Sequence, residues 1–174
     1  SMLVKHIFID QIQQATSIPI FIELKSLNDF EFLDNRLIDF IYHEIRSHHL
    51  DLEKQYFEVT LNAGRYTIIF DGLDEVNPSK RSWLDREIKE FVTLYNENRY
   101  VLSSRPSEEF IGWNQFIEYE ISKMDKVQAL ALINKLKYDE KVKKRFHKEL
   151  NGHLYDTHKS FASIPLLLTI MLMT

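Results

Sequence analysis

The sequence predicts an α/β protein: a parallel sheet flanked by helices, followed by a small all-helical subdomain. Short apolar runs typical of buried strands alternate with stretches in which apolar residues recur every three or four positions, as on one face of a helix. Strands that alternate with helices imply a parallel sheet. From Lys123 onward only the helical pattern remains. We therefore expect an α/β unit over residues 1–122 and a helical subdomain over residues 123–174.

The first half of the α/β unit begins with a helix, a strand and a second helix. The strand is expected over residues 17–24, where a continuous β-branched and apolar run is typical of a strand that is covered on both faces. The helices are indicated by their spaced apolar residues, which are Leu3, Val4, Ile7, Phe8 and Ile12 in the first and Leu33, Leu37, Ile41 and Ile45 in the second.

Three further strands are expected at residues 66–70, 99–104 and 116–122. Proline cannot donate a hydrogen bond to a neighbouring strand, so the strand at 99–104 ends before Pro106. Between the first two of these strands, apolar residues with helical spacing predict a helix, and they are Ile88, Phe91, Val92 and Tyr95.

Composition excludes several kinds of protein. The chain has 174 residues, 44% of them apolar, which is enough to bury a core. Its net charge of −4 gives no support for a nucleic-acid partner, and the lack of cysteine excludes disulfides and thiolate zinc sites. The longest apolar run, Ile164–Met173, is shorter than the roughly 20 residues that a membrane span needs. With no secretory pattern at the start, we expect a cytoplasmic protein without a membrane segment.

Residues that directly follow the predicted strands carry the candidate chemistry, because ligands of open parallel sheets bind at the carboxyl ends of the strands. Asp71 ends a buried strand and offers the carboxylate oxygen that Mg²⁺ prefers. Gly72 leaves room for a phosphate to approach the backbone. Asp74 and Glu75 are placed to polarise a water molecule, and the planar guanidinium of Arg105 suits phosphate oxygens.

The spacing of these residues adds to their meaning. An acid at the end of an apolar strand is common. Taken alone, Asp71 is better explained as an exposed residue in a turn than as a metal ligand. Arg105, however, follows Asp71 by 34 positions, which leaves room for one helix and one strand. The two residues therefore lie on strands that can be neighbours.

Four segments in this order resemble the motifs of NACHT domains, which belong to the STAND class of P-loop NTPases. IPIFIELK (18–25) is similar to the strand after the phosphate-loop helix, and IIFDGLDEV (68–76) to an extended Walker B motif. VLSSRP (101–106) is similar to the sensor 1 strand with its arginine. SIPLLLTIML (163–172) resembles the helical-subdomain motif whose proline, here Pro165, lies near the adenine.

The resemblance implies a P-loop NTPase-like sheet and an ATP-dependent switch for oligomerisation in defence or signal transduction, in which the full-length protein self-associates. ATP and Mg²⁺ would be its cofactors. Asp71 would hold Mg²⁺ through water, with Gly72 beside it, and Asp74 or Glu75 would orient the hydrolytic water. Arg105 would sense the γ-phosphate, and Pro165 would border the base.

One motif of the family is absent. The sequence contains no Walker A motif, G-x-x-x-x-G-K-[ST], and its opening residues resemble the helix that begins directly after that motif. The resemblance therefore implies a chain that starts just past the phosphate loop and lacks the first, central strand of the sheet. Without the loop and its lysine, the β- and γ-phosphates lose their main anchors. We expect the chain alone to bind nucleotide weakly or not at all and to be inactive.

Two other functions stay open. One is an ATP motor of the AAA+ or helicase-like kind. The SSRP arginine and the IPLLL segment favour the switch over this motor. The other is a non-catalytic scaffold for protein interactions. The complete acidic set DGLDE argues against a scaffold, whereas the absent phosphate loop argues for it. The residues encoded just before Leu3 discriminate: a Walker A motif there supports the NTPase, and its absence supports the scaffold.

Overall fold

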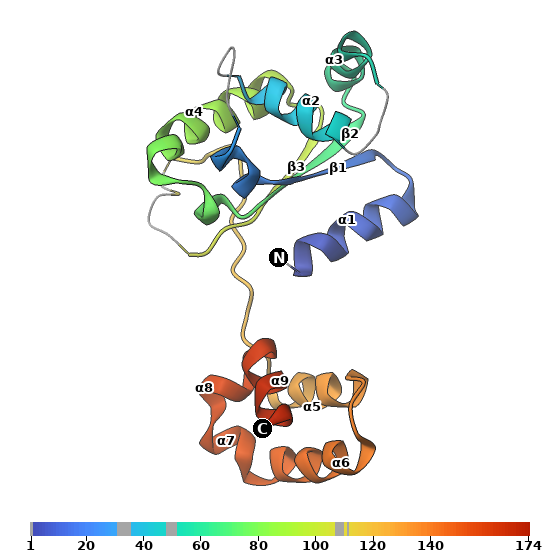
Figure 1. Cartoon of the computed structure of the whole chain (residues 1–174), viewed down its shortest axis with the longest axis vertical. Coiled ribbons are helices and arrows are strands. Elements are labelled where there is room, and N and C mark those ends of the chain that lie inside the picture. The colour runs from blue at the N-terminus through green and yellow to red at the C-terminus, as the bar shows by residue number, and fades with distance from the viewer. Residues whose placement is uncertain (1, 31–35, 48–51, 107–109, 111) are drawn as a thin grey trace. The chain divides into compact units, whose positions relative to one another are not determined.

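Three parallel strands form the sheet of the computed structural model, which describes residues 2–30, 36–47, 52–106, 110 and 112–174 (Figure 1). They are β1 (Ile18–Glu23), β2 (Tyr66–Asp71) and β3 (Arg99–Leu102), and they are neighbours in that order. The register aligns Glu23 with Asp71 and Phe70 with Leu102, so the three strands end at one edge. The predicted α/β class, with a parallel sheet flanked by helices, is confirmed.

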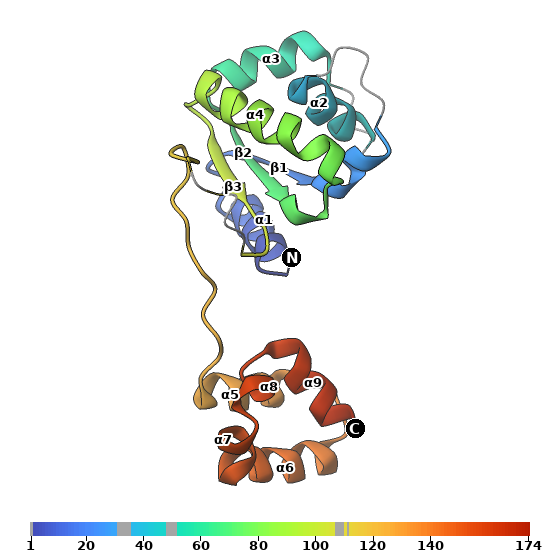
Figure 2. The ribbon, with the colours of Figure 1, turned by 90° about the vertical axis from the view of Figure 1, so that its left-hand side faces the viewer.

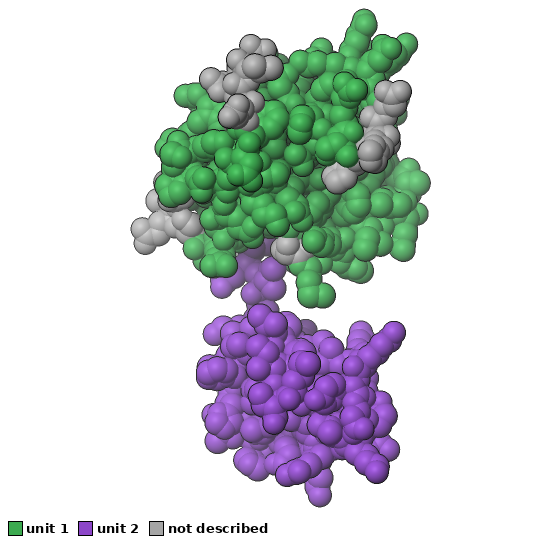
Figure 3. Space-filling view, viewed as in Figure 1, with its two compact units in different colours: residues 1–118 green, residues 119–174 purple. Residues whose placement is uncertain are grey.

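The chain divides into two compact units, Ser1–Glu118 and Tyr119–Thr174 (Figure 3). The first holds the sheet, and the second is built from helices. The sequence predicts this division after residue 122, and the structure has it after Glu118.

Helices cover both faces of the sheet (Figure 2). Helix α1 (Met2–Gln14) lies on one face, where the Phe8 ring centroid is 5.7 Å from that of Phe21. On the other face lie α2 (Leu37–Ser47), α3 (Lys54–Asn62) and α4 (Pro78–Leu94). The helical stripe predicted around Ile41 is therefore α2, although Leu33 lies outside the described residues.

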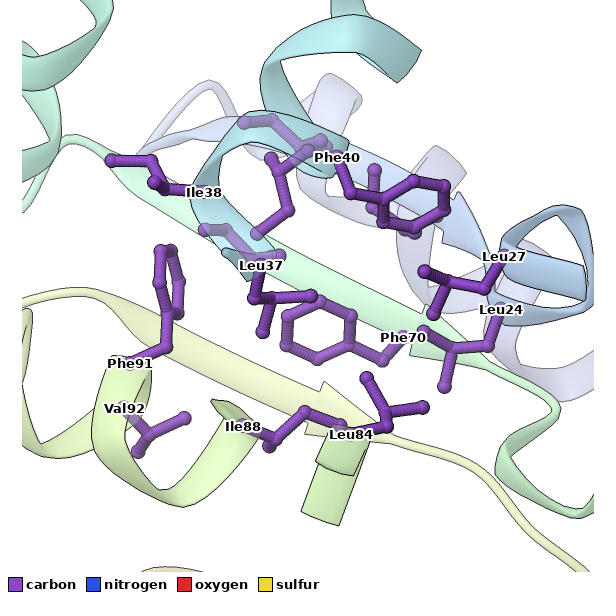
Figure 4. Packing of buried hydrophobic residues seen from close by; sticks show 14 of the residues in the cluster. Leu24, Leu27, Leu37, Ile38, Phe40, Phe70, Leu84, Ile88, Phe91 and Val92 are labelled. Atoms are coloured by element: carbon purple, nitrogen blue, oxygen red, sulfur yellow. The ribbon is translucent and has the colours of Figure 1, made fainter. Parts of the chain in front are cut away.

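The core lies between β1, β2 and the helices of the second face (Figure 4). β2 is buried along nearly all of its length because it has a strand on each side and helices over both faces. The first strand is predicted to be covered on both faces, and helices lie over both, but the cover is uneven: in β1 buried residues alternate with partly exposed ones, and Ile18 is 53% exposed. Alternate residues of a strand point to opposite faces, so the alternation shows that the face of β1 under α1 is covered less completely than the face with Ile20 and Ile22, which belong to the core.

The fourth strand, expected over residues 116–122, is not formed, and this prediction is wrong. In the described chain these residues have no secondary structure, and Ile117, Tyr119 and Ile121 are 80%, 83% and 71% exposed. Their alternation gives the period of a strand, but a strand also needs a neighbouring backbone to hydrogen-bond with. No described segment supplies that neighbour.

The second unit is a small bundle of helices: α5 (Lys126–Lys135), α6 (Glu140–Glu149), a π-helical turn (Leu150–Leu154), α7 (Tyr155–Thr157), α8 (Lys159–Ala162) and α9 (Pro165–Met173). Asp125 and Gln128 form a capping box at the start of α5, and the Asp139 side chain caps α6. The apolar core of the bundle includes Ile133 and Leu168. No helix in the described chain is both long and apolar enough to cross a membrane.

A buried asparagine connects the starts and ends of several elements in the first unit. Asn98 is only 7% exposed, and its Oδ1 accepts a hydrogen bond of 3.0 Å from the backbone N–H of Tyr66. Its amide nitrogen donates to the carbonyls of Leu61 and Tyr95, at 2.8 and 3.0 Å. One side chain thereby joins the end of α3, the start of β2 and the end of α4.

We predict that Asn98→Ala lowers the free energy of unfolding by about 2–3 kcal/mol, because it leaves buried backbone groups without partners. The matched control is Asn96→Ala, at an exposed position two residues earlier, which should change stability by less than about 0.5 kcal/mol. Urea unfolding measures both. Equal losses for the two variants would contradict the role given to Asn98.

Candidate functional site

The candidate site is built on the ends of β2 and β3. Backbone hydrogen bonds continue between the two segments beyond β3: Ser103 N–H donates to the Phe70 carbonyl, and Leu73 N–H donates to the Ser103 carbonyl, both at 2.9 Å. The acidic turn after β2 and the SSRP segment after β3 therefore lie side by side, as the spacing of Asp71 and Arg105 predicts.

Asp71 ends β2 and contacts Ser103. The Ser103 hydroxyl donates a hydrogen bond of 2.5 Å to Asp71 Oδ1. Partial burial raises the pKa of the Asp71 carboxyl. The hydrogen bond from Ser103 and the positive charge of Lys5 are among the effects that outweigh the burial, so the pKa of Asp71 lies below the ordinary aspartate value. Asp71 is therefore an anion at neutral pH.

Gly72 makes the turn after Asp71 possible. Its φ of +81° is in the left-handed region, which side chains disfavour. Its N–H donates to the Ser103 hydroxyl at 3.0 Å, and its carbonyl accepts from Glu75 N–H at 3.0 Å. A Cβ atom at this position would lie 3.1 Å from Cδ of Glu75. The glycine thus allows the strand end, the turn and the Glu75 side chain to lie close together.

Asp74 and Arg105 form a pair across the two segments. Asp74 Oδ1 accepts a hydrogen bond of 3.0 Å from the backbone N–H of Arg105, and its Oδ2 lies 3.2 Å from Nε of Arg105. The Arg105 side chain is nevertheless 87% exposed. An exposed ion pair of this kind contributes little energy, so the guanidinium can exchange Asp74 for another anion at small cost.

Glu75 is exposed, and its backbone is fixed by Asn28. The Asn28 amide nitrogen donates to the Glu75 carbonyl at 3.0 Å, and Asn28 Oδ1 accepts from the N–H of Asn77 at 2.8 Å. Asn28 ends the 3₁₀ turn Leu24–Asn28 that follows β1. Three loops at the carboxyl edge are thus linked, one after each strand.

The amino-terminal end of α1 reaches the same edge of the sheet. Lys5 Nζ lies 3.6 Å from Oε1 of Glu23, the last residue of β1, and its charge acts on Asp71. The amino-terminal turn of a helix carries partial positive charge and favours anions. The edge therefore combines fixed carboxylates with a positive helix end and an exposed arginine.

Pro165 belongs to the second unit, where it is the first residue of α9. This position suits proline, whose missing N–H would have no partner within the helix. Just before it, Ser163 is 1% exposed, and its hydroxyl has no hydrogen-bond partner in the described chain.

The site does not contain a complete metal cage of protein ligands. Among the residues that the structure describes, no group of three or more His, Cys, Asp or Glu side chains could hold a metal ion. A single ionised carboxylate fits Mg²⁺, which keeps several waters and shares its coordination with substrate phosphates. Asp71 has the chemistry that this arrangement requires.

The structure thus brings Asp71, Gly72, Asp74 and Arg105 together, with Glu75 on the same turn, and places Pro165 in the other unit.

Comparisons with protein-family models, with curated proteins and with solved structures found no match to this chain. Sequence reasoning missed Ser103 and Asn28. The serine lies in the quoted SSRP segment and could have been considered as a partner of Asp71, whereas nothing in the sequence marks Asn28.

The lowered pKa of Asp71 predicts a pH dependence of stability. A carboxyl whose pKa is lower in the folded than in the unfolded chain stabilises the fold above the ordinary aspartate pKa of about 4, and this contribution is lost as the pH falls through the lowered value. The free energy of unfolding, measured with urea between about pH 6 and about pH 3, should fall less in Asp71→Asn than in the wild type. An identical fall in both proteins would contradict this assignment.

Gly72→Ala tests the close packing of the acidic turn, with Gly112→Ala as its control. Both glycines have a positive φ, +81° and +83°, so each substitution should cost about 1–2 kcal/mol. Of the two, only Gly72 has a side chain near the added Cβ, since no atom of the described residues lies within 4 Å of a Cβ at Gly112. NMR shifts of the Glu75 side chain should therefore change in Gly72→Ala alone. An unmoved Glu75 in that variant would refute the contact.

Proposed function

We propose that this chain is part of the nucleotide-binding core of a NACHT-type P-loop NTPase of the STAND class. The full-length protein would then be an ATP-dependent switch for oligomerisation in defence or signal transduction. The proposal rests chiefly on one observation: the acidic turn and the SSRP segment meet at the carboxyl edge of a parallel sheet. Asp71 contacts Ser103 there, and Asp74 contacts Arg105.

The order of the strands supports the P-loop interpretation. The segments similar to the Walker B and sensor 1 motifs form adjacent strands, β2 and β3, and the strand similar to IPIFIELK lies beside β2. Lys5, near the start of α1, acts on Asp71 through its charge and pairs with Glu23 at the end of β1, so α1 begins near the acidic turn, as the helix after a phosphate loop would. The outer edge of β3 pairs with no described strand, so the sheet can accept a further strand there.

The residues at this edge suit phosphoryl transfer from ATP. Mg²⁺, when bound, would supply positive charge against the negative charge that develops on the phosphates. Asp71 supplies the ionised carboxylate that would hold this ion through water. Gly72 keeps the turn narrow beside it.

The pairing of Asp74 with Arg105 favours different roles for the two acids of the turn. Asp74 uses both carboxylate oxygens to hold Arg105, one through the backbone N–H and one through the guanidinium. Glu75 is exposed, and its backbone is fixed by Asn28, so Glu75 is the better candidate to orient the attacking water. Arg105 would leave Asp74 for the γ-phosphate, which offers it a more highly charged partner.

In the full-length protein, Asp71→Asn should lower Mg²⁺-dependent ATP hydrolysis by more than about 100-fold, because loss of the outer partners of a metal ligand already costs about 10- to 100-fold. The measurement is phosphate release at saturating ATP. Asp10→Asn, a change of the same kind on α1, is the control and should leave the rate within about twofold of the wild type.

An unchanged rate in Asp71→Asn would remove Asp71 from the metal site. Absence of hydrolysis and of ATP binding in the wild-type full-length protein would instead favour the scaffold.

A further inference from the structure

The Ser103 side chain forms hydrogen bonds to two of the residues named from the sequence. Its hydroxyl accepts from the N–H of Gly72 at 3.0 Å and donates to Oδ1 of Asp71 at 2.5 Å. A serine hydroxyl has one proton. Since the hydroxyl acts as acceptor toward Gly72, that proton is directed at Asp71, and the carboxylate is held in one orientation.

The backbone of Ser103 is fixed as well. Its N–H and its carbonyl bond to Phe70 and Leu73, on either side of Asp71 and Gly72. The hydroxyl therefore starts from a fixed position relative to the end of β2, and the Asp71 carboxylate cannot turn away without breaking its bond to Ser103.

The neighbouring serine provides a contrast. Ser104 is also part of the SSRP segment, but its buried Oγ has no hydrogen-bond partner among the described residues. Two serines, adjacent in sequence and equal in chemistry, thus differ in whether they contact Asp71. The difference separates an effect of the hydroxyl on Asp71 from a general effect of removing a serine from this segment.

We infer that Ser103 is a positioning residue that orients the Asp71 carboxylate toward a divalent cation. This inference rests on the proposed function, in which Asp71 holds Mg²⁺. Mg²⁺ demands near-ideal octahedral geometry, so a single carboxylate is useful only in the right orientation. Residues that fix the orientation of metal ligands commonly affect metal affinity about 10- to 100-fold.

Binding of Mn²⁺ alone to this chain tests the inference without nucleotide or activity. Paramagnetic broadening of the backbone amide signals of Asp71 and Gly72 reports weak binding and its location. Ser103→Ala should weaken Mn²⁺ binding about tenfold, whereas Ser103→Thr, which keeps the hydroxyl, should stay within about twofold of the wild type. Ser104→Ala should leave binding unchanged. The amide spectrum away from the carboxyl edge shows whether each variant keeps its fold.

The outcomes separate the inference from the proposed function. If Asp71→Asn abolishes the broadening and Ser103→Ala leaves it unchanged, the positioning role is wrong while the metal role of Asp71 stands. If Ser103→Ala and Ser104→Ala weaken binding equally, the effect belongs to the segment and the inference is again wrong. If wild-type Asp71 and Gly72 show no broadening, or Asp71→Asn does not reduce it, the metal role of Asp71 fails and the inference fails with it.

Discussion

The hydrogen bonds of Ser103 hold together the ends of the two strands that carry the candidate chemistry. Its backbone bonds continue the pairing of β2 with the β3 segment past the end of β3. Its hydroxyl holds the Asp71 side chain at the end of β2. Through the same arrangement Arg105 comes within reach of Asp74. Two short segments that are distant in sequence become one surface because parallel strands end at a common edge.

The carboxyl edge of the sheet is supported by the buried core and by hydrogen bonds between its loops. β2 is buried along nearly all of its length, and the core side chains of α2 and α4 pack on the face of the sheet away from α1 (Figure 4). The loops are fixed in addition: Asn28 bonds to the backbone on both sides of Val76, and Lys80 Nζ donates to three carbonyls after β1, those of Leu27, Asn28 and Phe30. The charged groups at the edge therefore stand on loops that are held by hydrogen bonds to one another.

The sequence predicts those parts of the fold that depend on local apolar pattern. The strands at 18–23 and 66–71 are continuous apolar runs, and both are found. Helix α3 is not predicted from the sequence, because it has only two buried residues, Phe57 and Leu61, which are too few to give a helical apolar pattern. The strand expected at 116–122 has the right alternation but lacks a neighbour, and no local pattern reports that. In the site, spacing predicts that Asp71 and Arg105 come close, but their hydrogen-bond partners, Ser103 and Asp74, depend on the turn at Gly72.

The central claim is that the carboxyl edge of this sheet receives a metal-bound triphosphate. A crystal structure of the full-length protein with Mg²⁺ and a non-hydrolysable ATP analogue tests it most directly. The account predicts the metal beside Asp71, with its carboxylate still bonded to Ser103, and the Arg105 guanidinium on the γ-phosphate instead of on Asp74. A nucleotide bound elsewhere, or one that leaves Asp71 and Arg105 without contact to the metal or its phosphates, would contradict it.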